Sequence, residues 1–367
     1  MCSCRGGAYG CRWLMSVQKE PFMSYEEPQG ASQLTVYPFQ ALPFEFTGRA
    51  DEYFKVWIVN IVLTVITLGV YSAWAKVRNK QYFYGNTRLQ QASFEYLANP
   101  LMILKGRGMV LGVFVIFGAI SSVYPFIEGT LWFLFFLATP WLVVRALEFR
   151  ARNTSHRHIR FAFQATYREA GVVYVLWPLL LVLLLGLAYP YFSYLQHRFV
   201  VNHSGFGTTP FELKLNDNPV RRFYGVYIAA ACLAMLFTMM GMVAVSVLGL
   251  SMTGFMCIAM GVFLAMAYIQ THIANLVWSH TWLGNHRLES TLATEQMAWL
   301  YFSNALAVVL TVGLLIPWAS IRMTRYRLAK LTLWVEGNLD EFAASESQAV
   351  TATGEELAGF FDVEAGL

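Results

Sequence analysis

The segment "TLGVYSAWAKVRNKQYFYGNTRL" (residues 67–89) guides the interpretation of the whole chain. Its first half is apolar, and its second half is basic and aromatic and reaches the turn-forming pair Asn86-Thr87. Trp74 stands where the character changes, and an amphipathic tryptophan ring is favoured at a membrane–water interface. Arg78 follows one helical turn later on the same face, within reach of phosphate headgroups. The segment is therefore interpreted as a helix that leaves a bilayer.

The composition of the chain indicates a membrane protein. The 367 residues are 57% hydrophobic and only 13% charged, whereas soluble domains carry about 25% charged residues. The missing charge is concentrated in long uncharged stretches, which indicates membrane spans rather than a large soluble core. The net charge of +4 arises from basic residues in short loops beside apolar segments. This is a topology signal and does not indicate nucleic-acid binding.

Seven apolar segments are long enough to cross about 30 Å of hydrocarbon. With seven crossings, the distribution of Lys and Arg predicts a cytoplasmic C-terminus and an N-terminus on the outer side. Residues 198–222 disagree with this topology, because they are basic and fall on the supposed outer side. The seven segments are residues 56–74, 108–127, 130–144, 172–195, 223–248, 252–277 and 299–318.

Internal repeats are predicted because residues 60–82 align without gaps with residues 304–326. The exits of three other segments repeat the second half of this pattern. If every copy leaves on the same side, three of the apolar segments must be re-entrant, and only the hairpins 108–144 and 223–277 cross. Seven crossings is the prediction, and four crossings with three re-entrant segments is the alternative. The matched pairs are Asn60–Asn304, Thr67–Thr311, Gly69–Gly313, Trp74–Trp318, Ala75–Ala319, Arg78–Arg322 and Tyr82–Tyr326.

The predicted fold is an all-α polytopic membrane protein with short β-hairpins at the helix ends. A first membrane half (42–197) and a second (198–342) stand between an N-terminal extension (1–41) and an acidic tail (343–367), both predicted to be disordered. No apolar h-region precedes residue 50, so no cleaved signal peptide is expected. Met23 opens an ordinary polar N-terminus, and the sequence leaves open whether translation starts at Met1 or at Met23.

No catalytic or cofactor motif is found, and the protein is not expected to be an enzyme. The common phosphate-loop, zinc-protease and nucleophile-elbow patterns do not occur. Cys2, Cys4 and Cys11 have a spacing that matches no usual metal site, and Arg157 between His156 and His158 disfavours a cation there. Neither a metal nor a cofactor is expected.

Two groups of residues are candidate ligand contacts. Asn60 and Asn304 lie at equivalent positions of the repeat, where repeat-built transporters coordinate substrate near the midplane; hydrogen bonding between helices is the commoner role of such residues. The second group consists of tryptophan–arginine pairs at the membrane exits, which either only anchor the helices or also bind anionic headgroups. Its members are Trp74 with Arg78, Trp141 with Arg145, and Trp318 with Arg322.

The chain resembles the YjgN family of bacterial inner-membrane proteins, a class of unknown function, over roughly residues 42–342. The resemblance rests on "EYFKVWIVNIVLTVITLGVYSAWAKVRNKQYFYGNTRL", "FEYLANPLMILKGR", "PWLVVRALEFRARNTSHR", "FGTTPF" and "LLIPWASIRMTRYRLAKLTL". It implies a multi-pass protein of the bacterial inner membrane. The family offers no catalytic or cofactor residues to carry over to this sequence.

Two functions are predicted. The first is a non-enzymatic protein that moves or gates a small solute or a lipid. The alternative is an envelope protein that does not transport, and whose basic cytoplasmic hairpins bind anionic lipid headgroups or a protein partner. The bilayer is the expected partner, and the sequence indicates neither a protein partner nor an oligomeric state.

Overall fold

A closed β-barrel organises the part of the chain that the structure describes. The structure, a computed structural model, describes residues 39–215, 218–337 and 339–349, which belong to one compact unit. Ten antiparallel strands within these residues close in the order β1-β10-β9-β8-β7-β6-β5-β4-β3-β2. The first half of β1 (Gln40–Phe46) pairs with β10 (Leu331–Val335), and its second half pairs with β2 (Thr87–Leu89). The first and the last strands therefore meet in one sheet.

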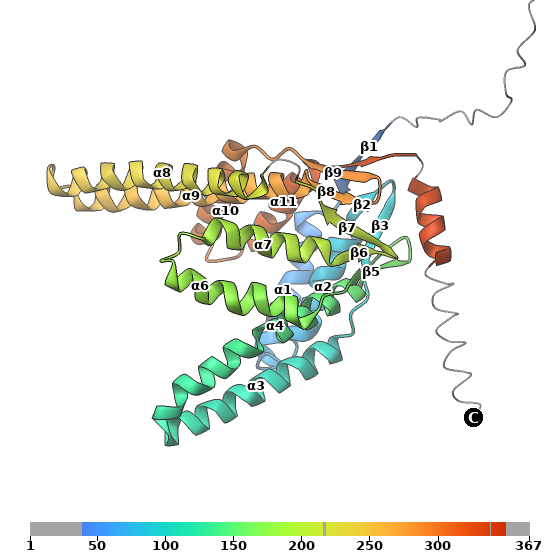
Figure 1. The fold of residues 1–367 in the computed structure, drawn as a ribbon, viewed down its shortest axis with the longest axis horizontal. Helices are drawn as coiled ribbons and strands as arrows, with labels where there is room; N and C mark the ends of the chain where they lie inside the picture. Colours follow the sequence, from blue (N-terminus) through green and yellow to red (C-terminus); the bar gives the residue numbers. More distant parts are fainter. Residues whose placement is uncertain (1–38, 216–217, 338, 350–367) are drawn as a thin grey trace, which may run out of the picture. The chain divides into compact units, whose positions relative to one another are not determined.

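Five helical hairpins alternate with the strand pairs in the described residues, and all of them extend from the same rim of the barrel (Figure 1). Tyr96 and Thr154 illustrate the reason. Tyr96 is the last residue of the strand before one helical hairpin, Thr154 is the first residue of the strand after it, and the two are paired in the sheet. The hairpin therefore leaves and re-enters the barrel at the same rim. The tight strand turns form the opposite rim. The helices are α1 (Ala50–Ile66) with α2 (Ser72–Gly85), α3 (Pro100–Val123) with α4 (Glu128–Arg152), α5 (Tyr167–Gly171) and α6 (Trp177–Leu183) with α7 (Tyr189–Asn202), α8 (Pro219–Ser246) with α9 (Ser251–Trp278), and α10 (Thr294–Leu310) with α11 (Ile316–Ala329). The other strands are β3 (Ala92–Tyr96), β4 (Thr154–His156), β5 (Ile159–Phe163), β6 (Ser204–Phe206), β7 (Thr209–Leu213), β8 (Thr281–Leu283) and β9 (His286–Ser290).

The prediction of an all-α fold with seven spans is wrong. Short hairpins at the helix ends were expected, but their union into one barrel depends on pairings between distant hairpins that no local pattern reveals. Among the described residues, four helices are long and apolar enough to cross a membrane: α3, α4, α8 and α9. They form the two hairpins that the alternative topology named as crossings. Because β1 and β10 are neighbours, the first and last strands cannot lie on opposite sides of a bilayer, as seven crossings between them would require. The two termini themselves lie outside the described residues.

The other three apolar segments are each broken by the same left-handed turn. Leu68 and Gly69 have φ angles of 48° and 92°, and the amide of Gly69 donates to the carbonyl of Thr64 at 2.8 Å. Leu185-Gly186 and Val312-Gly313 repeat this conformation. The helix on the N-terminal side of the first turn has 17 residues, or about 25 Å at 1.5 Å per residue. The break therefore leaves each arm shorter than a typical crossing.

Four of the hairpins end in the same pair of capping side chains. The last carbonyls of a helix lack partners within the helix, and here two consecutive side chains each bond to a carbonyl four residues earlier. Asn86, for example, donates to the carbonyl of Tyr82 at 2.8 Å, and Thr87 to that of Phe83 at 2.8 Å. Each pair ends the helix directly before a strand. The other pairs are Asn153 with Thr154, His203 with Ser204, and His280 with Thr281.

One backbone hydrogen bond recurs at all five junctions between helices and barrel. The residue after every odd-numbered strand donates its amide to the carbonyl of the residue that ends the following helical hairpin. The recurrence gives the five hairpins equivalent places on the rim; whether they arose by duplication of sequence stays a prediction. The pairs are Thr47–Asn86, Leu97–Asn153, Gln164–His203, Lys214–His280 and Thr291–Lys330, at 2.9 to 3.0 Å.

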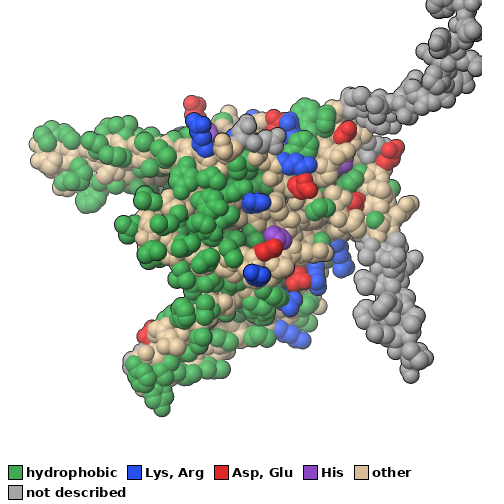
Figure 2. Space-filling view, in the orientation of Figure 1, with side chains coloured by type: hydrophobic (Ala, Val, Ile, Leu, Met, Phe, Trp, Pro, Cys, Tyr) green, Lys and Arg blue, Asp and Glu red, His purple; other side chains and the backbone are tan. Residues whose placement is uncertain are grey.

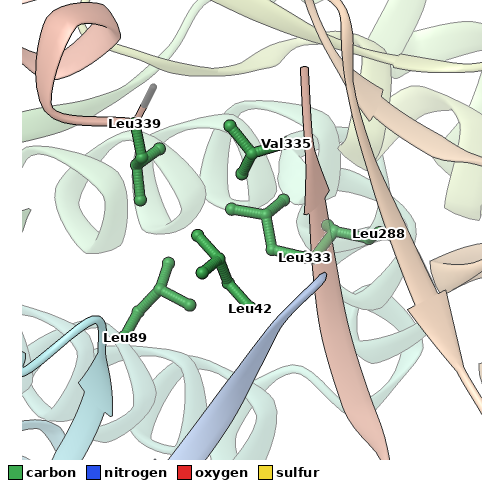
Figure 3. Close-up of a cluster of buried hydrophobic side chains, with 6 residues drawn as sticks. All are labelled: Leu42, Leu89, Leu288, Leu333, Val335 and Leu339. Atoms are coloured by element: carbon green, nitrogen blue, oxygen red, sulfur yellow. The ribbon is translucent and has the colours of Figure 1, made fainter. Parts of the chain in front are cut away.

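The barrel interior is a packed core. Leu42, Leu89, Leu288, Leu333 and Val335 form one buried cluster, in which Leu339 also lies (Figure 3). Stacked and edge-to-face aromatic rings continue across the interior, with centroid distances of 5.2 to 6.4 Å. These rings belong to Phe44, Phe94, Phe161, Phe206 and Phe211.

A helix of residues 339–349 covers the rim of the barrel that carries the tight turns. Leu339, Ala343 and Glu346 recur at helical spacing and are buried, and Phe342 packs between the two clusters of the core. At the two ends of this helix, Asp340 pairs with Arg157 and Glu346 binds the β6–β7 turn. The predicted acidic tail began at 343, so its first seven residues belong to this helix, and residues 350–367 lie outside the described ones. The predicted boundary at 197/198 falls within α7, and residues 1–38 of the predicted extension are also outside the description.

Glu346→Ala is expected to loosen this covering helix. The Glu346 carboxylate accepts from the Thr208 amide at 2.6 Å, from the Thr208 hydroxyl at 2.9 Å and from the Thr209 hydroxyl. Loss of a buried charged acceptor costs about 1–3 kcal/mol. Burial raises the pKa of Glu346, but the hydrogen bonds from Thr209 and Thr208 outweigh it and lower the pKa below 4.5. This stabilisation is therefore present above pH 4.5 and is lost as the pH falls through the folded-state pKa.

Thermal unfolding of the full chain in detergent, at neutral pH and in acid, measures this effect. Glu341→Ala is the matched control, because Glu341 is an exposed carboxylate on the same helix. Equal stability of the two variants at neutral pH would contradict the assigned contact.

Candidate functional site

A cleft of about 520 Å³ opens between α1 and α11. It lies where the first and the last helical hairpins meet, because closure of the barrel brings β1 beside β10. Its lining residues come from the start of α1, the middle of α10 and most of α11. They are Arg49, Ala50, Asp51, Leu300, Trp318, Ile321, Arg322, Arg325, Tyr326 and Ala329.

The lining of the cleft changes from apolar to basic along α11. This helix runs from the tip of its hairpin towards the barrel, so Trp318 and Ile321 lie nearer the tip and Arg325 lies nearer the barrel. Arg49, which precedes α1, is at the barrel end as well. The lining residues include three arginines and one carboxylate, that of Asp51, so the cleft carries a net positive charge.

Arg322 contacts two other residues that the sequence singled out, Asn304 and Trp318. Its Nη1 donates to Asn304 Oδ1 at 3.2 Å and to Ser303 Oγ at 2.6 Å. Its guanidinium carbon lies 5.1 Å from the ring centre of Trp318, within the range of a cation–π contact. The predicted residues Asn304, Trp318 and Arg322 thus form one cluster at the cleft.

Arg49 and Arg325 were not predicted from the sequence. Arg49 pairs with Asp51 through two contacts, Nε to Oδ1 at 3.2 Å and Nη2 to Oδ2 at 3.1 Å. Arg325 Nη2 donates to the carbonyl of Gly48 at 2.9 Å. The spacing of Arg325 three residues after Arg322 was a signal that both share a helical face. No local pattern could have placed Arg49 beside α11, because only barrel closure does so.

The repeated tyrosines hold the starts of the two helices in position. The Tyr82 hydroxyl accepts from the amide of Arg49 and donates to its carbonyl, both at 2.9 Å. The Tyr326 hydroxyl does the same at Ala293, at 3.0 and 3.5 Å. Each tyrosine therefore supplies the cap that the first helix of its hairpin lacks, and Tyr326 also lines the cleft.

Asn60 has a different set of contacts from Asn304. It is buried, with 3% of its surface exposed, and its Nδ2 donates to Asn79 Oδ1 at 2.9 Å. Asn304 Nδ2 donates to the carbonyl of Ala319 at 3.3 Å. Each asparagine thus binds the two helices of its own hairpin together, which is the helix–helix role considered above.

The two remaining tryptophan–arginine pairs lie outside the cleft. On α2, Arg78 is exposed and lies 5.7 Å from the ring centre of Tyr71, on which Trp74 stacks at 6.1 Å. On α4, Arg145 pairs with Glu148 at 3.2 Å, and half of the surface of Trp141 is exposed.

The described residues contain no group of three or more His, Cys, Asp or Glu placed to hold a metal ion. The three N-terminal cysteines lie outside them. His156 is buried in the barrel, where its ring stacks on Phe94 at 4.4 Å. Burial and the nearby Arg157 lower the pKa of His156 to about 4, against a weaker opposing effect of the Ser93 backbone. The ring is therefore neutral at physiological pH.

A family described as "Bacterial protein of unknown function (DUF898)" matches residues 41–360, a range that contains all five helical hairpins of the described chain and its barrel except the first residue of β1. The chain belongs to this family. Membership of the DUF898 family agrees with the resemblance inferred from the sequence motifs.

The curated relatives are named as membrane proteins. The Inner membrane protein YjgN of Salmonella typhimurium is 34% identical over 144 residues, which cover 38% of this chain and 36% of that protein. The protein of the same name from Escherichia coli K12 is 28% identical over 144 residues, 39% and 36% of the two chains. The chain thus matches little more than a third of the length of these relatives. No solved structure matches it. Four described helices of this DUF898 family member are long and apolar enough to cross a membrane, which agrees with the names of these relatives.

Proposed function

We propose that this protein resides in the bacterial inner membrane and binds anionic lipid headgroups where its helices join the barrel. The distribution of charge along the hairpins carries the proposal. The outer parts of the two long hairpins, residues 108–144 and 223–277, contain no Lys or Arg. Basic side chains gather instead towards the barrel, to the right of the apolar helix surface (Figure 2).

Tryptophan–arginine pairs at these junctions support the proposal. Trp318 with Arg322, and Trp74 with Arg78, combine an interfacial ring with a cation one turn closer to the barrel. An anionic leaflet attracts each Lys or Arg near its surface by about 1 kcal/mol. The positive-inside rule would then assign the barrel to the cytoplasm.

Headgroup binding is favoured over solute transport. A conduction path along the barrel axis needs a polar lining, whereas Phe94, Phe161 and Phe206 fill the interior. The asparagines considered as a substrate site both bind within their own hairpins. We therefore favour a protein that binds the anionic headgroups of the leaflet next to its helix–barrel junctions.

Replacing Arg78 and Arg145 together with glutamine is expected to weaken the preference of the reconstituted protein for anionic lipid. In a chain whose other nine tryptophans are replaced with phenylalanine, quenching by brominated phosphatidylglycerol, compared with brominated phosphatidylcholine, measures this preference at Trp74 and Trp141. Each lost charge should reduce it about fivefold, corresponding to roughly 1 kcal/mol.

The control for this experiment removes two arginines from the outer surface of the barrel. Arg88 and Arg160 are exposed on β2 and β5, and their replacement with glutamine changes the net charge equally. Equal quenching by the two lipids in wild type, or equal loss in both double variants, would refute the proposal.

A further inference from the structure

The α1–α11 cleft has the chemical character of a site for a single lipid. Its lining includes the cations of Arg49, Arg322 and Arg325 and the apolar side chains of Leu300, Trp318 and Ile321, and the Arg322 guanidinium lies over the Trp318 ring. Phosphate is recognised by guanidinium groups, which offer several N–H donors in one plane. An acyl chain or glycerol backbone would instead contact the apolar side chains.

The cations of the cleft are partly available to a ligand. A guanidinium carries five N–H donors, and the contacts of Arg322 Nη1 and Arg325 Nη2 use only some of them. Both side chains lack a carboxylate partner among the described ion pairs, whereas Arg49 is paired with Asp51. The cleft volume of about 520 Å³ is in the range of small-molecule sites, about 300–1,000 Å³, and exceeds what one inorganic phosphate fills.

We infer that this cleft binds the phosphate of one anionic lipid, with Arg322 and Arg325 as its contacts and Asp51 as a competing anion. This inference rests on the proposed function, which is headgroup binding at the basic helix–barrel junctions. It assigns one lipid molecule to one cleft. The lipid would link the first hairpin to the last across the place where the barrel closes. A ligand that binds the folded protein, with its barrel closed, and not the unfolded chain stabilises the fold. The stabilisation grows as the ligand concentration exceeds the dissociation constant.

Two substitutions should change the affinity of the cleft for an anionic lipid in opposite directions. Arg325→Gln removes a charged donor and should weaken binding about tenfold, as expected for a hydrogen bond between charged groups. Asp51→Asn removes the competing carboxylate with little change of size and should strengthen binding several-fold. Arg327→Gln is the matched control, because Arg327 lies on the same helix but contacts Tyr301 at 2.7 Å and does not line the cleft.

Thermal unfolding of the full chain in neutral detergent measures the affinities, with dihexanoyl phosphatidylglycerol as the probe. Dihexanoyl phosphatidylcholine and inorganic phosphate form the other two arms. A larger rise in Tm with phosphatidylglycerol than with either of these, weakened by Arg325→Gln and strengthened by Asp51→Asn, supports the site. An equal rise with inorganic phosphate at equal concentration overturns the lipid assignment.

The result also separates this site from the proposed function. If neither Arg325→Gln nor Asp51→Asn changes the response while the Arg78 and Arg145 double variant loses its lipid preference, the cleft assignment fails and the general function stands. If the cleft variants respond and the double variant does not, a single lipid site stands without a broader headgroup-binding surface.

Discussion

Gly254→Ala is expected to destabilise the α8–α9 hairpin by about 2 kcal/mol, within the range for overpacking a well-packed interior. A methyl group at this position would lie 2.2 Å from Val245 Cγ2 and 2.7 Å from the carbonyl oxygen of Gly241. The backbones of α8 and α9 approach closely here, as small residues allow in membrane helix pairs. Relief of the clash requires the two helices to separate.

Gly112→Ala supplies the matched comparison. Gly112 lies in α3, another long apolar helix, but nothing lies within 4 Å of a Cβ built there. Because alanine favours the helix over glycine by about 1 kcal/mol, this substitution should be neutral or stabilising. Denaturant unfolding in detergent, followed by tryptophan fluorescence, distinguishes the two. Similar stabilities for both variants would show that α8 and α9 are not in close contact.

A cysteine at Glu212 is expected to be labelled from the same side of the membrane as one at Asn285, and from the opposite side to one at Gly129. Glu212 and Asn285 are exposed on β7 and in the β8–β9 turn. Gly129 lies at the tip of the α3–α4 hairpin. Because all helical hairpins return to the same rim of the barrel, every strand turn shares one side. The basic residues in 198–222, which disagreed with seven crossings, then lie with the other basic segments.

A membrane-impermeant maleimide, applied to right-side-out and inside-out vesicles, measures this topology in a chain whose five native cysteines are replaced. The positive-inside rule predicts that Glu212→Cys and Asn285→Cys react only in inside-out vesicles, and Gly129→Cys only in right-side-out vesicles. Reaction of Glu212→Cys and Gly129→Cys from the same side would mean that two crossings, residues 130–144 and 172–195, separate these positions, as in the seven-crossing topology, rather than α4 alone. That result would contradict the arrangement in which all helical hairpins extend from the same rim of the barrel.

The candidate cleft was only partly predictable from the sequence. Arg322 and Trp318 could be selected because a helical spacing of four and an interfacial residue pair are local properties. Asn304 was selected by its match to Asn60, but its contact with Arg322 depends on packing within the hairpin. Arg49 is about 270 residues away along the chain, and only the β1–β10 pairing brings it to the site.

The sequence alone determined the membrane class, the apolar segments, the positions at which helices end and the family. All of these are local properties, since hydropathy, capping pairs such as Asn86-Thr87 and turn glycines such as Gly69 act over one or two helical turns. Only the tertiary structure decided that five strand pairs close into one barrel, that three apolar segments fold back and that the first and the last strands are neighbours. Strand pairing and ring closure depend on contacts between residues far apart in the chain, and the pattern of a single hairpin does not specify its partner.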